Sequence, residues 1–194
     1  MVKIVGLVGS PRDGNTLILV KEALLAAEKL GCDTELVHLG CMKIAPCSCC
    51  EGCRKENKCV IDDDFQQVSD SVSKADGVII GSPVYFGGMS AQLKSFVDRT
   101  RYLRRENALV DKIGGAISVG GARNGGQETA IQQIHNFFFI HGMIVVGDEN
   151  TRHYGGTGQA QNKADSKKDA FGIETSRNLG AHVAKVAIKL KNKP

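Results

Sequence analysis

The chain alternates short apolar runs with longer segments in which apolar residues recur every three or four positions. The short runs are rich in β-branched residues and end in turn residues, which is typical of strands buried on both faces. The longer segments have the period of amphipathic helices. The pattern predicts strands over 2–9, 34–39, 77–82, 112–120 and 143–148, and helices over 16–30, 62–75, 90–103, 128–141 and 173–190.

Strands that alternate with helices predict a parallel sheet with helices on both faces, in a three-layer α/β fold. Because crossovers are right-handed, few topologies remain, and five strands with the longest apolar run first favour the order 2-1-3-4-5. We therefore expect a single domain over 1–194, with a cysteine-rich loop at 41–61 inserted after the second strand. Ligands of such sheets bind at the C-terminal ends of the strands, beside the point where the strand order reverses.

Composition narrows the class of protein. The 194 residues are 42% hydrophobic and 24% charged, which is ordinary for a chain that buries a full core. The stretch 1–10 lacks the features of a signal peptide, and no apolar run reaches the roughly 20 residues of a membrane helix. A net charge of +4 is too small to indicate nucleic-acid binding. We expect a cytoplasmic protein that binds neither membrane nor nucleic acid.

The first strand ends in "GSPRDGNT", a turn that leads into a helix. Ser10, Asn15 and Thr16 are short polar side chains, Arg12 adds a positive charge, and free N–H groups at the helix start can bind an anion. The spacing matches neither the Walker pattern nor G-x-G-x-x-G, so a single phosphate is favoured over a nucleoside triphosphate or a dinucleotide. An ordinary capped turn is the alternative interpretation.

Two further strand ends carry candidate ligand-binding loops. "SPVYFGGMS" places Tyr85 and Phe86 where they could pack on a flat ring, although a hydrophobic plug over the sheet would look the same. "GGARNGGQE" has four glycines, which let backbone N–H groups approach a ligand closely. Three such loops at neighbouring strand ends are stronger evidence than any one of them.

Five of the seven cysteines lie in "CSCCEGCRKENKC" (47–59), which suggests a disulfide, a zinc site or an iron–sulfur cluster. A reducing compartment and an odd number of cysteines argue against disulfides. Cys47, Cys50 and Cys53 are spaced by two residues and Cys59 follows after five, so four thiolates can surround one compact object. Structural zinc more often takes two separated pairs, and a cluster is therefore favoured, with zinc as the alternative. Cys49 is interpreted as a spare thiol.

The three loops together resemble the NAD(P)H-dependent FMN reductase branch of the flavodoxin-like superfamily, and the cysteine motif resembles that of the iron–sulfur flavoproteins of anaerobic archaea and bacteria. The resemblance implies non-covalently bound FMN with its phosphate at Ser10, Arg12, Asn15 and Thr16. It implies a [4Fe–4S] cluster on Cys47, Cys50, Cys53 and Cys59. The flavin ring is expected along Pro83, Val84, Tyr85, Phe86, Gly87, Gly120, Gly121, Arg123, Gly125 and Gly126.

The resemblance also implies a function. Reduced ferredoxin would deliver electrons to the cluster, which would pass them to FMN and on to dioxygen or hydrogen peroxide, with no catalytic side chain required. It implies a homotetramer as well. The alternatives are an NAD(P)H-dependent FMN or quinone oxidoreductase with a structural cysteine loop, and a redox sensor or electron carrier without turnover. We expect Arg54, Lys55 and Lys58 to face an acidic donor. The long polar segment 150–168 is expected to cover the flavin or reach a neighbouring subunit, with disorder as the alternative.

Overall fold

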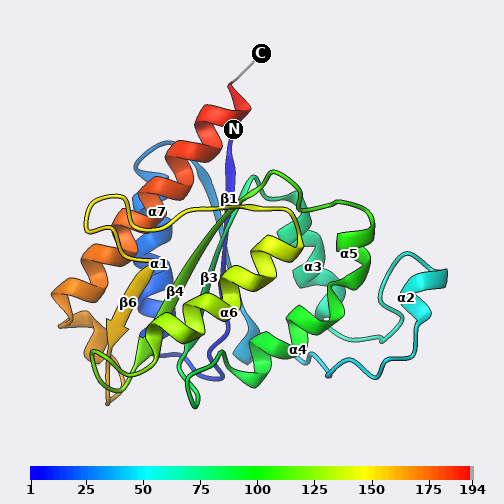
Figure 1. Ribbon diagram of the computed structural model, residues 1–194, viewed down its shortest axis with the longest axis horizontal. Helices are drawn as coiled ribbons and strands as arrows, with labels where there is room; N and C mark the ends of the chain where they lie inside the picture. The colour runs from blue at the N-terminus through cyan, green and yellow to red at the C-terminus, as the bar shows by residue number, and fades with distance from the viewer. Residues whose placement is uncertain (193–194) are drawn as a thin grey trace.

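The computed structural model describes residues 1–192 and has a parallel sheet at its centre (Figure 1). The strands are β1 (Lys3–Val8), β2 (Asp33–His38), β3 (Gly77–Pro83), β4 (Ile113–Gly120), β5 (Ile144–Val145) and β6 (Gly156–Gln159). The α-helices are α1 (Asn15–Glu28), α2 (Gly52–Lys55), α3 (Phe65–Lys74), α4 (Ala91–Arg99), α5 (Arg101–Arg105), α6 (Gln127–Ile140) and α7 (Ala170–Lys191), with 3-10 turns η1 (Leu39–Cys41) and η2 (Asp165–Lys167).

The predicted strand order is confirmed, because the sheet runs β2-β1-β3-β4-β5 with every pairing parallel. β1 lies between β2 and β3, with Leu7 opposite Val37 on one side and Ile80 on the other. The strand order therefore reverses at β1, and the loops after β1, β3 and β4 meet at one edge of the sheet.

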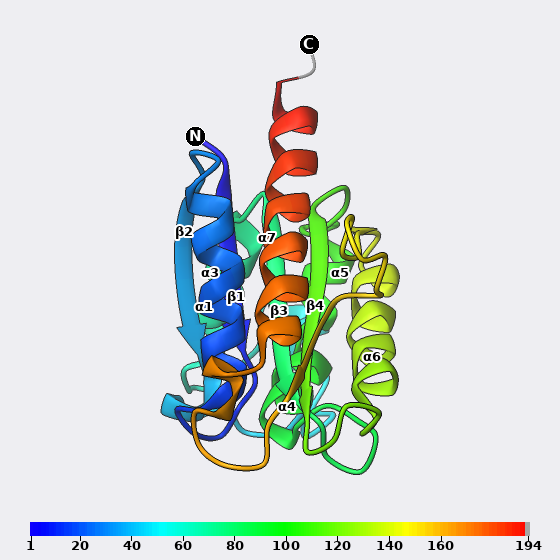
Figure 2. The same ribbon diagram turned by 90° about the vertical axis from the view of Figure 1, so that its left-hand side faces the viewer.

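Helices cover both faces of the sheet (Figure 2). α1 and α7 pack on one face, over a core that includes Ile4, Ile79 and Val183. α3, α4, α5 and α6 pack on the other, over a core that includes Phe65 and Phe96. Each sheet face is thus buried, which explains why the central strands read as continuous apolar runs rather than as alternating ones.

The fifth strand differs from the prediction. The expected strand over 143–148 shortens to β5, and the segment 150–168, expected to be a loop, contains β6 and η2. The chain leaves the sheet because Asp148 accepts hydrogen bonds from the backbone N–H groups of Asn150 (2.9 Å) and Thr151 (3.2 Å), which form a turn. It then returns, and β6 pairs with Ile117–Gly120 of β4.

The helix expected over 90–103 is interrupted at Thr100, where α4 ends and α5 begins. The cysteine loop (41–61) leaves the sheet after β2 and η1 and extends to the end of the molecule that carries α2 (Figure 1). Across residues 1–192 no helix combines the length and the apolar composition that a membrane span requires.

Candidate cofactor sites

The β1–α1 loop (9–14) is a tight turn fixed by the buried side chain of Ser10. Its hydroxyl donates to the backbone carbonyl of Arg12 (2.8 Å) and accepts from the Arg12 N–H (3.3 Å). Gly14 precedes α1 and makes no side-chain cap, so the N–H groups of the first helical turn are free to bind an anion. Arg12 is exposed beside them.

A hollow of about 150 Å³ joins this loop to the ends of β3 and β4. It is lined by Ser10, Arg12, Asn15, Thr16, Pro83, Val84, Tyr85, Val119, Gly121 and Ala160. The four residues expected at a phosphate thus line the same hollow as four of those expected along a ring, Pro83, Val84, Tyr85 and Gly121. Phe86, Gly87, Gly120, Arg123, Gly125 and Gly126, which were also expected at the ring, lie outside its lining.

The β3–α4 loop (84–90) forms a small hairpin in which Tyr85 and Gly88 exchange backbone hydrogen bonds of 2.9 Å each way. Phe86 stands at its tip, fully exposed and with a φ of 50°. A left-handed backbone conformation is uncommon for a residue as large as phenylalanine. A flat ring bound over the hollow would give this exposed side chain a packing partner.

The β4–α6 loop (121–126) is braced from beneath by Gln127, which is completely buried. Its amide nitrogen donates to the carbonyls of Ala122 (2.6 Å) and Gly158 (3.0 Å), and its amide oxygen accepts from the N–H of Gly125 (2.8 Å). The loop also touches its neighbour, since a Cβ on Gly126 would lie 3.2 Å from the Cα of Gly87. These glycines therefore bring the two loops together.

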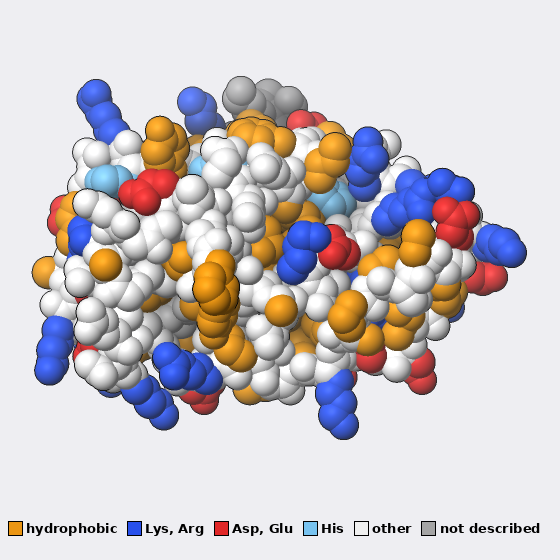
Figure 3. Space-filling view, turned by 60° about the horizontal axis from the view of Figure 1, so that its bottom comes forward, with side chains coloured by type: hydrophobic (Ala, Val, Ile, Leu, Met, Phe, Trp, Pro, Cys, Tyr) orange, Lys and Arg blue, Asp and Glu red, His pale blue; other side chains and the backbone are white. Residues whose placement is uncertain are grey.

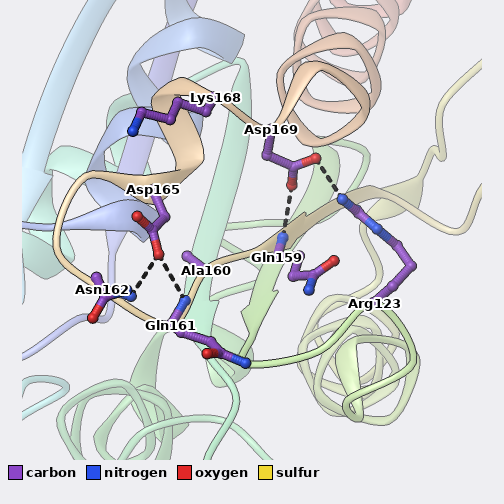
Figure 4. A pocket seen from close by; sticks show the side chains of 8 residues that line it. All are labelled: Arg123, Gln159, Ala160, Gln161, Asn162, Asp165, Lys168 and Asp169. Atoms are coloured by element: carbon purple, nitrogen blue, oxygen red, sulfur yellow. Dashed lines mark hydrogen bonds and ion pairs between the residues drawn. The ribbon is translucent and has the colours of Figure 1, made fainter.

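The segment 159–169 forms the polar wall of a neighbouring pocket, which shares Ala160 with the hollow (Figure 4). Asp169 accepts from the N–H of Gln159 (2.7 Å) and pairs with Arg123, while Asp165 accepts from the N–H of Asn162 (2.6 Å).

The side chain of Asn15 joins α1 to this wall. Its amide donates to the carbonyl of Asn162 (2.8 Å) and accepts from the N–H of Ser166 (3.0 Å). Asn15 and Arg123 therefore hold the surroundings of the hollow in place and are already engaged with protein groups.

A second cavity, of about 60 Å³, lies in the cysteine loop. Its lining includes five thiols, those of Cys47, Cys49, Cys50, Cys53 and Cys59. All four cysteines of the predicted motif are thus brought to one place. Cys53 and Cys59 pack against the main hydrophobic core, whereas Cys47 and Cys50 are exposed.

The backbone turns sharply on both sides of Cys50, because Cys49 and Glu51 have φ values of 55° and 59°. The backbone N–H of Gly52, and then the Ser48 side chain, hold the pKa of the Cys50 thiol below its ordinary value. This loop conformation favours the thiolate, which is the form that binds metal.

Arg99 lies against this cavity and is the main residue that the sequence did not reveal. Its side chain is completely buried, and its Nε donates to the Sγ of Cys59 at 3.3 Å. One terminal nitrogen donates to the carbonyl of Ala45 (3.1 Å) and the other to that of Ile61 (3.2 Å), and Asp63 completes the set through a 2.6 Å ion pair. Arg99 therefore ties both ends of the cysteine loop to one point.

Helix α4 connects the two sites. At its start, Ser90 accepts from the N–H of Leu93 (3.2 Å), and its hydroxyl donates to the carbonyl of Gly9 in the β1–α1 loop. At its end stands Arg99, against the cysteine cavity. The sequence signals only one of these two roles. Serine is a common helix cap, which fits Ser90, but nothing in "VDRT" marks Arg99 as buried.

Comparisons with known proteins agree with this arrangement. A WrbA-like flavodoxin from Agrobacterium tumefaciens has a similar fold, with a TM-score of 0.70 and 21% identity over 97% of this chain and 99% of the other. The family model described as NADPH-dependent FMN reductase matches residues 2–155.

Two relatives share more of the sequence. An iron–sulfur flavoprotein of Methanocaldococcus jannaschii is 53% identical over 98% of this chain and 100% of its own length. Another, from Methanosarcina thermophila, is 46% identical over 90% of this chain and 89% of its own.

A parallel sheet with this strand order, and with a hollow where the order reverses, defines a protein of the flavodoxin-like fold. With the cysteine cavity and the two relatives added, the chain belongs to the iron–sulfur flavoproteins, within the family of NADPH-dependent FMN reductases. Membership implies FMN and an iron–sulfur cluster as cofactors of a redox protein. The hollow, with its anion-binding loop and aromatic hairpin, and the cavity lined by thiols fit these two groups chemically.

Proposed function

We propose that this protein receives single electrons from reduced ferredoxin at a [4Fe–4S] cluster and passes them to FMN, which discharges them to small oxidants such as dioxygen or hydrogen peroxide. The observation that carries the proposal is a cavity lined by five thiols at one end of α4, whose other end is hydrogen-bonded through Ser90 to the β1–α1 loop that helps line the flavin hollow. The cluster supplies one-electron transfer and FMN accommodates electron pairs.

The spacing of the thiols supports a cluster over zinc. Four sulfurs on one zinc ion at about 2.3 Å would lie about 3.8 Å from one another. Among residues 1–192, no three motif cysteines have their sulfurs within 4.8 Å of each other. Sulfurs that line one cavity without converging this closely fit an object larger than a single ion.

Cys47, Cys50, Cys53 and Cys59 are the proposed ligands. Cys59 accepts a hydrogen bond from Arg99, and the pKa of Cys50 is lowered by local hydrogen bonds, first that of the Gly52 N–H. Cys49 lines the same cavity but directly precedes Cys50 and has a φ of 55°, and we treat it as the spare thiol.

In the flavin site, the chain's own groups bind and orient. The free N–H groups at the start of α1 and the Arg12 guanidinium would hold the phosphate. Tyr85 and Phe86 would cover the ring and exclude water from one side, and Gly121 lets backbone approach it closely. No protein acid or base is needed for electron flow through this site.

A basic surface supports docking of an acidic donor such as ferredoxin. Arg105 donates to the carbonyls of Cys53 (3.1 Å) and Arg54 (2.9 Å), so α5 packs against the cysteine loop. The basic residues of both segments thereby lie on one surface around the thiol cavity, and Figure 3 shows Lys and Arg side chains at that end of the molecule, with Asp and Glu side chains among them. We expect electron delivery from ferredoxin to slow as salt rises; a rate indifferent to ionic strength would contradict this docking mode.

We also propose a homotetramer in which electrons cross between subunits. Helix α4, nine residues and roughly 13 Å long, lies between the loops that form the two sites within one chain. β2 is an edge strand, and the cysteine loop that follows it extends away from the sheet, so it can approach the flavin site of a neighbouring subunit. Mixed oligomers would test this, with C50A/C53A in one subunit type and R12A in the other. Transfer restored only in the mixture supports crossing, whereas a stable, fully active monomer refutes it.

The decisive experiment is an absorption spectrum of anaerobically purified protein, with iron and sulfide analysis. We expect flavin bands, a broad cluster shoulder and about four irons and four sulfides per chain. C50A and C53A should lose iron and sulfide but keep FMN, while the matched variant C49S keeps both. One zinc per chain with no sulfide would refute the cluster.

The family match to NADPH-dependent FMN reductases supports a second candidate, an NAD(P)H-dependent FMN or quinone oxidoreductase. Anaerobic titration with NADPH separates the two functions. Stoichiometric reduction of the flavin by NADPH, without reduction by ferredoxin, would favour this alternative.

A further inference from the structure

Three side chains with different metal-binding groups meet outside the cysteine cavity, beside the β1–α1 loop. They are Asp13, His38 and Cys41, and one donor atom from each lies within 4.8 Å of the other two. The Nδ1 of His38 is 3.1 Å from the Sγ of Cys41 and 3.8 Å from the Oδ1 of Asp13. Neither the flavin nor the cluster uses any of these groups.

The backbone explains how they come together. His38 is the last residue of β2, and the turn η1 brings Cys41 back over it, since side chains three apart in a 3-10 turn are eclipsed. Gly40 presses this turn against the β1–α1 loop: a Cβ there would lie 2.5 Å from the carbonyl oxygen of Ser10. That loop supplies Asp13.

The geometry excludes a catalytic relay. In a Cys–His–Asp relay, the thiol and the carboxylate contact opposite nitrogens of the ring, so that a proton can pass through it. Here both face Nδ1, while Nε2 is buried and has no hydrogen-bond partner within residues 1–192. Three donors converging on one point are arranged as metal ligands are.

We infer that Asp13, His38 and Cys41 form a zinc site. Zinc takes thiolate, imidazole and carboxylate together, at about 2.3 Å from sulfur and 2.0–2.2 Å from nitrogen and oxygen. A tetrahedral site with these bond lengths places neighbouring donors about 3.3–3.6 Å apart, and the two observed separations, 3.1 Å to sulfur and 3.8 Å to oxygen, lie on either side of that range. The His38 side chain is 12% exposed and that of Asp13 73%, so water can take the fourth position.

Zinc here would link two functional loops. Asp13 lies in the anion-binding turn, and Cys41 begins the cysteine loop. A bound ion would therefore hold the start of the cysteine loop against the turn that receives the flavin phosphate. The site is independent of the proposed electron pathway, because it shares no ligand with either cofactor.

The test measures zinc binding to the FMN- and cluster-loaded protein by equilibrium dialysis, after iron and sulfide analysis. A second preparation carries serine at Cys47, Cys50, Cys53 and Cys59, so that the motif cannot take zinc whether or not a cluster forms. Zinc K-edge absorption then reports the ligands. The variants are C41S, H38Q and D13N, with D62N at another exposed aspartate as the matched control.

We expect one zinc per chain in both preparations, with a single sulfur near 2.3 Å and the remaining ligands nitrogen or oxygen near 2.0 Å. C41S and H38Q should weaken binding at least about tenfold, since even outer partners of metal ligands contribute that much, and D62N should not. Failure to bind stoichiometric zinc, or binding that C41S and H38Q leave unchanged, overturns the site. Low iron and sulfide would instead count against the cluster alone.

Discussion

Replacing Arg99 with glutamine tests whether one buried cation holds the cysteine loop in place. The change removes the ion pair with Asp63, the hydrogen bond to Cys59 and the bonds to two loop carbonyls. Burial works to raise the Asp63 pKa, and the hydrogen bond from Arg99, with the N–H groups of Ala45 and Phe65, outweighs it and keeps that pKa low. Without Arg99, the carboxylate would be left without a partner cation.

The loss of stability expected for R99Q can be calculated from this geometry. Removing one partner of a buried ion pair typically costs 3–5 kcal/mol. The Asp63 side chain is 11% exposed and keeps N–H bonds from Ala45 (2.8 Å) and Phe65 (3.1 Å), so we expect the lower end, about 3 kcal/mol. For a chain of this size, 1 kcal/mol shifts the melting temperature by about 2–4 °C, which predicts a fall of about 6–12 °C.

Thermal and urea unfolding of the FMN-loaded, cluster-free protein measure the stability, and iron retention after anaerobic reconstitution measures the loop. R101Q is the control, because Arg101 is 43% exposed and its contact with Glu51 is 3.6 Å long, a pair worth about 0–1 kcal/mol. R99K separates charge from geometry. It should keep Asp63 paired and recover part of the stability, but a single ammonium cannot replace the fork that also reaches Cys59 and the carbonyls.

Equal stability of R99Q and R101Q would refute the reasoning, and so would full iron retention by R99Q. The double variant R99Q/D63N gives a further check. It should be less destabilised than the sum of the single changes, because it leaves no lone buried charge.

Three other predictions concern different regions. Burial, and then the charge of Arg104, lower the pKa of His141 to about 4. The free energy of unfolding should therefore be greatest above about pH 6.5 and fall towards pH 4 by on the order of 3 kcal/mol. H141Q should flatten this pH dependence in urea titrations at several pH values, and an unchanged pH dependence would contradict the prediction. F86A should leave the melting temperature unchanged but weaken FMN binding about tenfold in fluorescence titrations, because Phe86 is fully exposed in the protein alone; equal affinity would place the ring elsewhere. G180A should lower the free energy of unfolding by at least about 1 kcal/mol, because its Cβ would lie 2.1 Å from the carbonyl oxygen of Ala23 and force α7 from α1; a variant as stable as the native chain would refute that close packing.

The sequence predicted those parts of the fold that depend on local pattern. Apolar runs such as "GVIIGS" and the helical period of 16–30 predicted the strand order, because parallel strands buried on both faces leave a clear signal. Strand β6 was not predicted, because "GTGQ" is not rich in β-branched residues and does not alternate apolar with polar ones. It becomes a strand only through its pairing with β4.

For the cofactor sites, the sequence indicated which residues would gather but not the hydrogen bonds that they make. The motif spacing located the thiols, but it could not show that Arg99, forty residues after Cys59, donates to its sulfur. Asn15 is expected at a phosphate, which stays a prediction, and the sequence did not show that its amide also holds the backbone at 162 and 166. Long-range contacts of polar side chains carry no periodic signal, so they appear only when the chain is folded.

Helix α4 has a consequence for how such a chain could be altered by insertion or deletion. Successive residues of an α-helix are rotated by about 100° around its axis. One residue added between Ser90 and Arg99 would therefore point the guanidinium away from Cys59 and also lengthen the helix. Only insertions close to whole turns would restore its direction, and each turn would move the two cofactor sites about 5.4 Å further apart. The helix therefore fixes both the distance and the rotation between its two ends, which makes this segment less tolerant of length changes than the cysteine loop it supports.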